Sequence, residues 1–290
     1  MKKCFSMEID RCSRCGLCHG LKRAVGLAEN LVAEGWNVFT DGDLSHGDTL
    51  AKRLSSIGIA NWDGKLREFG HRDCILIRSH GISPARHKLL NSLGCKIFDC
   101  TCPVVRASGK LVENLVAKGG YVIFFGKKNH PELIGLAGHG GSNLVACEDE
   151  NDLAAINQPV DKMVALICQT TADGDKFSKF STAAKKRFPT ISVIDTACRE
   201  VELRRSELRE KLREKKFDAL LVVGSKRSSN GRALEEIGKA AAVETFLVES
   251  AEELPKNFTD AHDKILIASA TSTAMETVAA IEVSISAAAV

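Results

Sequence analysis

The sequence contains no apolar run that approaches the roughly 18 residues needed to span a membrane. It also lacks an excess of charge of one sign, since 40 lysines and arginines face 37 aspartates and glutamates, so no general attraction to nucleic acid is expected. No secretory signal is recognisable, because Lys2 and Lys3 precede only a brief apolar stretch, and no low-complexity linker interrupts the chain. These absences predict a cytoplasmic globular protein whose partners are neither nucleic acids nor membranes.

Cysteine, by contrast, is plentiful, with 11 residues in a chain of 290. Their number is odd and no export signal accompanies them, so a disulfide framework is not expected. Metal or redox chemistry is the better interpretation for part of this set. Cys74, Cys95 and Cys147 stand in apolar or edge contexts without companions, and we expect them to act as small hydrophobic residues.

An internal repeat organises the chain. The run Leu27–Gly35 closely matches Leu111–Gly119, 84 positions later. The same spacing separates two further pairs, Cys18 from Cys102 and His46 from His130. A third, more diverged copy surrounds Cys198. Repeats of this kind indicate similar structural modules, and three such modules can close around a pseudo-threefold axis on which their cysteines meet.

Short apolar, β-branched runs alternate with helical stretches along the whole chain, as at Tyr121–Phe125 and Ala219–Val223. This alternation predicts an α/β fold with mainly parallel sheets. The repeat divides it into three similar modules at 18–102, 103–197 and 198–290, with residues 1–17 packing on the third. Residues 199–216 are so rich in charge of both signs that we expect a solvated surface helix there.

In parallel α/β sheets, ligands bind beyond the carboxyl ends of the strands. The loops at these predicted ends carry small hydrogen-bonding side chains that suit an anion such as phosphate: His46, His80, His130, Ser228, Ser229, Asn230 and Ser272. Glu132 is the only carboxylate so placed, which makes it the candidate proton donor. Thr170 is a candidate for binding a substrate hydroxyl or relaying a proton, although a helix-capping role fits it as well.

The three repeated cysteines predict a soft metal centre, either zinc or an iron–sulfur cluster. Cys18, Cys102 and Cys198 are too dispersed for the local ligand pairs of a structural zinc site. A [4Fe–4S] cluster normally takes four cysteines, so three would leave one iron open to bind a substrate oxygen. Cys12, Cys15 and Cys18 also form a C-x2-C-x2-C run. Two interpretations fit it equally: a second metal centre, or reduced thiols without a metal. The same choice applies to Cys4, Cys100 and Cys168.

Together these motifs resemble the LytB/IspH family of 4-hydroxy-3-methylbut-2-enyl diphosphate (HMBPP) reductases over nearly the whole chain. The matching runs are Gly16-Leu17-Cys18-His19-Gly20, Ser79-His80-Gly81, Asp99-Cys100-Thr101-Cys102-Pro103, His130-Pro131-Glu132, Gln169-Thr170-Thr171, Val222-Val223-Gly224-Ser225 and Ser228-Ser229-Asn230.

The resemblance implies three α/β domains around a [4Fe–4S] cluster held by Cys18, Cys102 and Cys198. It implies that the seven anion-binding candidates bind diphosphate and that Glu132, Thr170 and His130 take part in catalysis. The implied reaction removes an allylic hydroxyl as water after two one-electron reductions, giving isopentenyl and dimethylallyl diphosphate. Ferredoxin or flavodoxin is the implied electron donor.

The chain departs from the family pattern at several positions, among them Leu17, His19 and Gly47, and two further departures bear on the substrate. Arg199-Glu200-Val201 replaces a Tyr-Ala-Thr run after the third cysteine, and Thr271-Ser272-Thr273-Ala274 replaces a Gly-Ala-Ser-x-Pro loop. Glu200 would repel a diphosphate unless Arg199 or Arg227 paired with it. These departures keep open a paralogue that acts on another substrate, and the surplus cysteines keep open a non-catalytic iron–sulfur redox or sensor protein.

Overall fold

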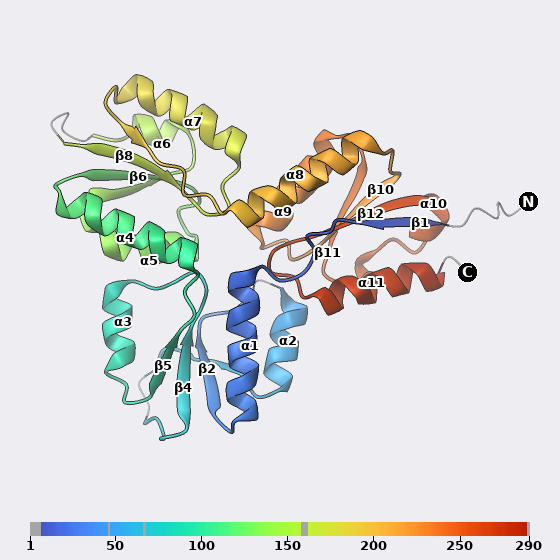
Figure 1. The fold of residues 1–290 in the computed structure, drawn as a ribbon, viewed down its shortest axis with the longest axis horizontal. Helices are drawn as coiled ribbons and strands as arrows, with labels where there is room; N and C mark the ends of the chain where they lie inside the picture. Colours follow the sequence, from blue (N-terminus) through green and yellow to red (C-terminus); the bar gives the residue numbers. More distant parts are fainter. Residues whose placement is uncertain (1–6, 46, 66–67, 158–161, 289–290) are drawn as a thin grey trace, which may run out of the picture. The chain divides into compact units, whose positions relative to one another are not determined.

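The computed structural model describes residues 7–45, 47–65, 68–157 and 162–288 of the chain (Figure 1). Its strands form three four-stranded sheets, and the pairing within each sheet is parallel throughout. The predicted α/β class with mainly parallel sheets is therefore confirmed. No described helix has both the length and the apolar composition needed to cross a membrane.

The first sheet has the order β3-β2-β4-β5. Its strands are β2 (Asn37–Asp41), β3 (Ala60–Asn61), β4 (Asp73–Ile77) and β5 (Lys96–Asp99). The helices that accompany them in the sequence are α1 (His19–Ala33), α2 (Asp48–Ser56) and α3 (Pro84–Asn91). The central strand β4 is buried along its whole length, and Ile75 and Ile77 pack with Leu90 of α3.

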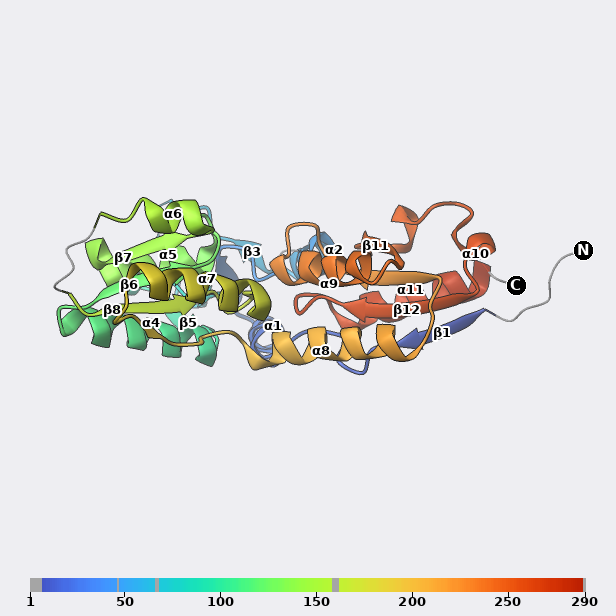
Figure 2. The ribbon, with the colours of Figure 1, turned by 90° about the horizontal axis from the view of Figure 1, so that it is seen from above.

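The second sheet repeats this order as β7-β6-β8-β9. Its strands are β6 (Tyr121–Phe125), β7 (Leu144–Cys147), β8 (Val164–Cys168) and β9 (Ser192–Val193). The helices of this part are α4 (Pro103–Ala117), α5 (Pro131–Gly140), the 3-10 turn η1 (Gly141–Asn143), α6 (Glu150–Ala154) and α7 (Gly174–Arg187). Helices α4 and α5 cover one face of the sheet, and α6 and α7 cover the other (Figure 2).

The third sheet has the order β1-β12-β10-β11. Its strands are β1 (Glu8–Arg11), β10 (Ala219–Val223), β11 (Glu244–Val248) and β12 (Lys264–Ser269). The elements between and around them are α8 (Arg199–Glu214), α9 (Ser229–Ala240), η2 (Ala251–Glu253), α10 (Phe258–Ala261) and α11 (Met275–Ala288). Read from β11, the order matches the other two sheets, with the N-terminal β1 in the place that β5 and β9 occupy.

The chain divides into two compact units. One contains the described residues of 1–25, 43–57 and 199–290, and the other contains those of 26–42 and 58–198. In the first unit, α8 and α9 bury Leu208 and Leu234 on one face of the third sheet, while α11 buries Val278 on the other. Because both faces are covered, the central strand β10 is apolar and buried at every position.

Candidate functional site

Each of the three repeated cysteines occupies the same local position. It follows an edge strand of a sheet, namely β1, β5 or β9, and stands directly before a helix, namely α1, α4 or α8. In each case the cysteine N–H donates a hydrogen bond to a carbonyl in the loop after the neighbouring strand. The three bonds are Cys18 to Thr271 at 2.9 Å, Cys102 to Ser79 at 2.9 Å and Cys198 to Thr170 at 2.8 Å. The repeat detected in the sequence is thus also a repeat of backbone geometry.

The same type of turn precedes two of these cysteines, Cys102 and Cys198, in the chain. The carboxylate of Asp99 accepts a hydrogen bond from the N–H of Thr101 at 2.8 Å, and that of Asp195 accepts one from Ala197 at 2.9 Å. An aspartate that bonds the backbone two residues later forms a tight turn at the strand end. Pro103 then fixes the first residue of α4 after Cys102. All three cysteines are half-buried, and none of the described cysteines forms a disulfide.

Glu132 lies in the first turn of α5 and is almost completely buried, with 1% of its surface exposed. Thr170, in the loop after β8, donates hydrogen bonds to both carboxyl oxygens of Glu132. The backbone N–H of Thr170 donates to Oε1 at 2.9 Å and its hydroxyl donates to Oε2 at 2.6 Å. Burial nevertheless raises the pKa of Glu132 from 4.5 to about 7, because the ionised form is deprived of water. Glu132 can therefore hold or release a proton near neutral pH.

His130 caps the same helix. Its Nδ1 accepts a hydrogen bond from the N–H of Glu132 at 3.2 Å, so a proton on the neutral ring must sit on Nε2. The ring of His80 meets it edge to face, with 5.4 Å between centroids. The structure therefore brings together four of the predicted residues in one unit, His80, His130, Glu132 and Thr170.

The remaining anion-binding candidates that the structure describes lie in the other unit, at the ends of β10 and β12. Ser228 caps α9 by accepting from the N–H of Gly231 at 3.2 Å. The side-chain oxygen and nitrogen of Asn230 and the hydroxyl of Ser272 are buried, yet no partner in the described part of the chain satisfies them. Ser229 is half-exposed in the first turn of α9.

Buried polar atoms are nearly always paired, so those of Asn230 and Ser272 indicate a polar ligand. The loops that carry them also approach each other closely. A Cβ on Gly224 would lie 2.7 Å from the Cβ of Ala270, so only glycine fits at that position. The hydroxyl of Ser45 donates to the carbonyl of Ser272 at 3.1 Å, which fixes the loop that leads to His46. His46 itself lies outside the described residues.

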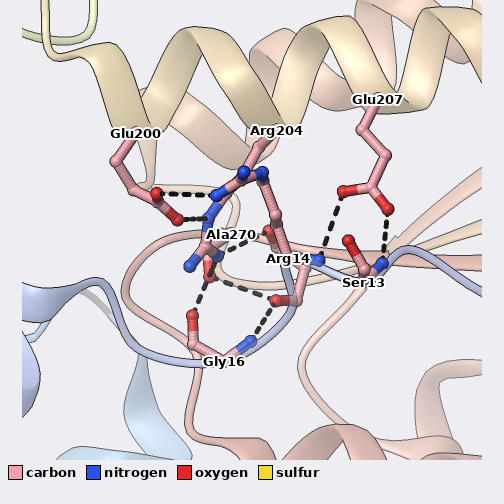
Figure 3. Close-up of polar contacts among 8 residues, drawn as sticks. Ser13, Arg14, Gly16, Glu200, Arg204, Glu207 and Ala270 are labelled. Atoms are coloured by element: carbon pink, nitrogen blue, oxygen red, sulfur yellow. Dashed lines mark hydrogen bonds and ion pairs between the residues drawn. The ribbon is translucent and has the colours of Figure 1, made fainter.

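Sequence reasoning did not find Arg204, which the structure places at the centre of a polar cluster (Figure 3). This side chain of α8 is 5% exposed. Its guanidinium donates to the carbonyls of Gly16 at 2.8 Å and Ala270 at 3.4 Å. Arg204 thereby links the loop before Cys18 to the loop before Ser272. Helix α8 is therefore not simply solvated, because it buries an arginine against both loops.

The charge of Glu200 is neutralised differently from the sequence-based expectation. Its carboxylate pairs with Arg204 at 3.0 Å and with Arg14 at 3.4 Å, rather than with Arg199 or Arg227 (Figure 3). Arg227 instead pairs with Asp48 at 2.6 Å. Arg14 reaches α8 because Glu207 accepts hydrogen bonds from the backbone N–H groups of Ser13 and Arg14, at 2.5 and 3.2 Å.

The additional cysteines are mostly core residues. Cys12 packs with Leu208 and Leu220 and is 4% exposed, and burial raises its pKa to about 12. Burial also raises the pKa of Cys15, and raises that of Cys168 to about 12. Cys100 is 2% exposed, and Cys4 lies outside the described residues. Within the ranges that the structure describes, no three His, Cys, Asp or Glu side chains are grouped as the ligands of a single metal ion would be.

Comparison with known proteins gives one consistent family. A protein family described as "LytB protein" matches residues 9–286. A 4-hydroxy-3-methylbut-2-enyl diphosphate reductase from Aquifex aeolicus is 33% identical over 245 residues, covering 82% of each chain. The same enzyme from Petrotoga mobilis is 32% identical over 274 residues, covering 92% of this chain and 93% of the relative.

Two solved structures resemble the fold described above. One is an (E)-4-hydroxy-3-methyl-but-2-enyl diphosphate reductase, described as the terminal enzyme of the non-mevalonate pathway. It is 30% identical, superposes with a TM-score of 0.72 and covers 96% of this chain and 98% of that chain. The other is the E-1-hydroxy-2-methyl-but-2-enyl-4-diphosphate reductase of Plasmodium falciparum, with 25% identity, a TM-score of 0.86 and coverage of 94% and 86%.

Proposed function

The chain belongs to the LytB family, and on that premise we infer that it catalyses the reductive dehydroxylation of HMBPP. The observation that carries this inference is that relatives with this activity match the chain over most of its length, at 30% identity or more. The reaction consumes two electrons and two protons. The C–O bond of the allylic hydroxyl breaks, and the products are water and isopentenyl or dimethylallyl diphosphate.

Cys18, Cys102 and Cys198 are the proposed ligands of a [4Fe–4S] cluster. Their thiols fit this group, because they are half-buried and stand before helices whose N-terminal dipoles favour negative charge. The ligands of a cluster are bonded to different irons and lie farther apart than those of one ion. When bound through these three thiolates, such a cluster would supply electrons and would keep one iron without a protein ligand.

The diphosphate is proposed to bind the side chains at the carboxyl ends of the strands: His46, His80, His130, Ser228, Ser229, Asn230 and Ser272. The unsatisfied buried atoms of Asn230 and Ser272 support this assignment, since phosphate oxygens would pair with their donors. The N-terminus of α9 adds backbone N–H groups and a positive dipole end. Nδ1 of His130 accepts a hydrogen bond from the backbone N–H of Glu132, so Nε2 is the donor of the neutral ring and the atom that would donate to a phosphate oxygen.

Glu132 is the proposed proton donor to the departing hydroxyl. With a pKa of about 7 it remains partly protonated at neutral pH, which an exposed glutamate would not. Thr170 is proposed to orient this carboxyl group and to pass on its proton through the 2.6 Å hydrogen bond. His130 fixes the backbone of Glu132 through its Nδ1.

The other features of the site support the same function. Glu200 is paired with two arginines, so it no longer gives a reason to expect a different substrate. The thiol of Cys12 is buried and that of Cys15 is half-buried, and desolvation raises the pKa of both, which favours packing over a second metal centre because a metal ligand must be a thiolate. Ferredoxin or flavodoxin remains the proposed electron donor, and the cytoplasm the proposed location.

The test is anaerobic turnover of HMBPP by the cluster-loaded protein with reduced methyl viologen. We expect both C5 diphosphate products, and a loaded protein that yields neither would reject the function. Glu132→Gln should keep the cluster spectrum and lose about 100-fold or more in turnover. Glu150→Gln, which changes an exposed glutamate of α6, is the matched control and should retain wild-type turnover. A redox carrier would instead show no dependence on Glu132.

A further inference from the structure

A cavity of about 510 Å³ lies within the unit that contains residues 58–198, beside α3, α4 and α5. Helix α5 packs against both α3 and α4, and its residues Gly135, Leu136 and His139 form part of the lining. The volume is in the range of small-molecule sites in proteins. Of the proposed substrate-binding and catalytic residues, His80 lines this cavity, whereas His130, Glu132 and Thr170 do not.

The shape of the cavity is fixed by close backbone packing. A Cβ on Gly138 would lie 2.3 Å from the Cβ of Ser83, and one on Gly135 would lie 3.5 Å from the backbone of Gly81. Helix α5 can therefore sit this close to the loop before α3 only because Gly138 has no side chain, whereas Gly135 lies at an ordinary contact distance. Contacts between backbones leave little freedom to collapse, so the cavity exists without a ligand.

Two lysine side chains at the cavity form no ion pair in the described part of the chain. Arg106 pairs with Asp99 at 2.9 Å, and His139 pairs with Glu113 at 2.6 Å. Lys88 of α3 and Lys110 of α4 also line the cavity, and neither has an acidic partner in the described part of the chain. The ammonium groups are thus available to an anion that enters from solvent.

The deeper wall is apolar. Val105 and Leu136 are buried residues that line the cavity, with Ile82 half-buried beside them. A purely inorganic anion would leave this wall without a partner, while a neutral hydrocarbon would leave Lys88 and Lys110 unused. The lining therefore matches a molecule that has both an anionic head and a short apolar body.

We propose that this cavity is a second ligand site, which binds a small phosphorylated amphiphile. The phosphate or diphosphate group binds Lys88 and Lys110 at the mouth, and the hydrocarbon body packs against Val105 and Leu136. Lysine ammonium groups are common phosphate ligands, and no covalent step is involved. The site is distinct from the proposed substrate site, with which it shares only His80.

The probe is n-hexyl phosphate, titrated by calorimetry into the cluster-loaded full chain under anaerobic conditions. The double variant Lys88→Ala/Lys110→Ala should weaken its binding by about tenfold, from the loss of two partly screened charge contacts. Lys118→Ala, at the exposed end of α4, is the matched control and should change the affinity by less than about twofold.

A second variant tests the cavity without changing charge. Gly109 lines it from α4, and a Cβ there would meet the ring of His139 at 3.5 Å, an ordinary contact, so Gly109→Leu should fold and fill the space. It should abolish binding of hexyl phosphate. Inorganic phosphate and 1-hexanol, titrated separately, should each bind at least about tenfold more weakly than the combined molecule, because each uses only half of the lining.

Asn230→Ala distinguishes binding in the cavity from binding at the proposed substrate site, because Asn230 lies in the other unit. That variant should leave hexyl phosphate affinity unchanged. The proposal is overturned if hexyl phosphate does not bind, if Asn230→Ala removes the binding while the lysine variant does not, or if Gly109→Leu binds as the wild type does. None of these readouts depends on HMBPP turnover, so failure of this proposal leaves the proposed function intact.

Discussion

Thr170 forms hydrogen bonds with both Glu132, the proposed proton donor, and Cys198, a proposed cluster ligand. Its hydroxyl and backbone N–H donate to the two oxygens of Glu132, at 2.6 and 2.9 Å, while its carbonyl accepts the N–H of Cys198 at 2.8 Å. One residue thus fixes the position of the proton donor and of a proposed cluster ligand. Ser79 and Thr271 accept from the other two cysteines in the same way, but only Thr170 also holds a buried carboxyl group.

Removing the Thr170 hydroxyl should move the pH dependence of turnover. In Thr170→Val the hydrogen bond that lowers the pKa of Glu132 is lost, so this pKa should rise above about 7. The protonated form is the active one, and turnover is therefore lost as pH rises through the pKa. The midpoint of that loss should shift to higher pH in Thr170→Val and stay near the wild-type value in Thr170→Ser, which keeps a hydroxyl. A midpoint that is the same in all three proteins would contradict the role of Thr170.

The same carboxyl group should impose a pH dependence on folding stability. The pKa of Glu132 is raised from 4.5 to about 7, so the folded state binds a proton more tightly than the unfolded state. The stabilisation from this proton is complete below pH 4.5 and is lost as pH rises toward 7. Linkage puts the loss at about 3 kcal/mol. Glu132→Gln removes the titrating group, so its stability relative to the wild type should increase by that amount between pH 4.5 and 8.

Denaturant unfolding of the two proteins in the cluster-free state, at matched ionic strength, measures this difference. Other titrating groups cancel because they are common to both proteins. A stability difference that does not change with pH would show that Glu132 ionises as an ordinary exposed glutamate.

The repeat explains why the sequence predicted so much of this fold. The apolar runs Tyr121–Phe125 and Ala219–Val223 form the expected strands, and the 84-residue spacing correctly indicated that Cys18 and Cys102 share a local setting. Strand β1 was missed because Glu8–Arg11 is a short edge strand with charged residues at both ends, without the apolar run used to find strands. Its pairing with β12 depends on contacts more than 250 residues apart in the sequence, which no local pattern records.

The local sequence pattern could not predict which arginines of α8 are buried. Arg204 and Arg205 are 5% and 1% exposed, while Arg209 pairs with Glu202 near the surface. These residues look alike in a highly charged helix. Only the loops that fold onto α8 determine which guanidinium is buried, and the carbonyls of Gly16 and Ala270 are provided by segments distant in the sequence.

Arg204 should therefore contribute far more to the free energy of unfolding than Arg209 does. Arg204→Ala leaves the carbonyl of Gly16 and the carboxylate of Glu200 without their main donor, and we expect a loss of about 2–3 kcal/mol in the free energy of unfolding. Arg209→Ala, one turn along the same helix, breaks an exposed pair and should cost less than about 1 kcal/mol. Urea unfolding at neutral pH measures both. Similar losses in the two variants would mean that Arg204 does not clamp the two loops.

Iron content should separate the repeated cysteines from the others. Changing Cys18, Cys102 or Cys198 to serine removes a proposed ligand, and each variant should lose the cluster absorbance after anaerobic reconstitution. Cys12→Ala changes a buried thiol and Cys15→Ala a half-buried one, and the raised pKa of both disfavours metal binding. Both should retain about four irons per chain, the content of one [4Fe–4S] cluster. About eight irons in the wild type, with a fall to about four in Cys12→Ala, would instead establish a second cluster in the N-terminal segment.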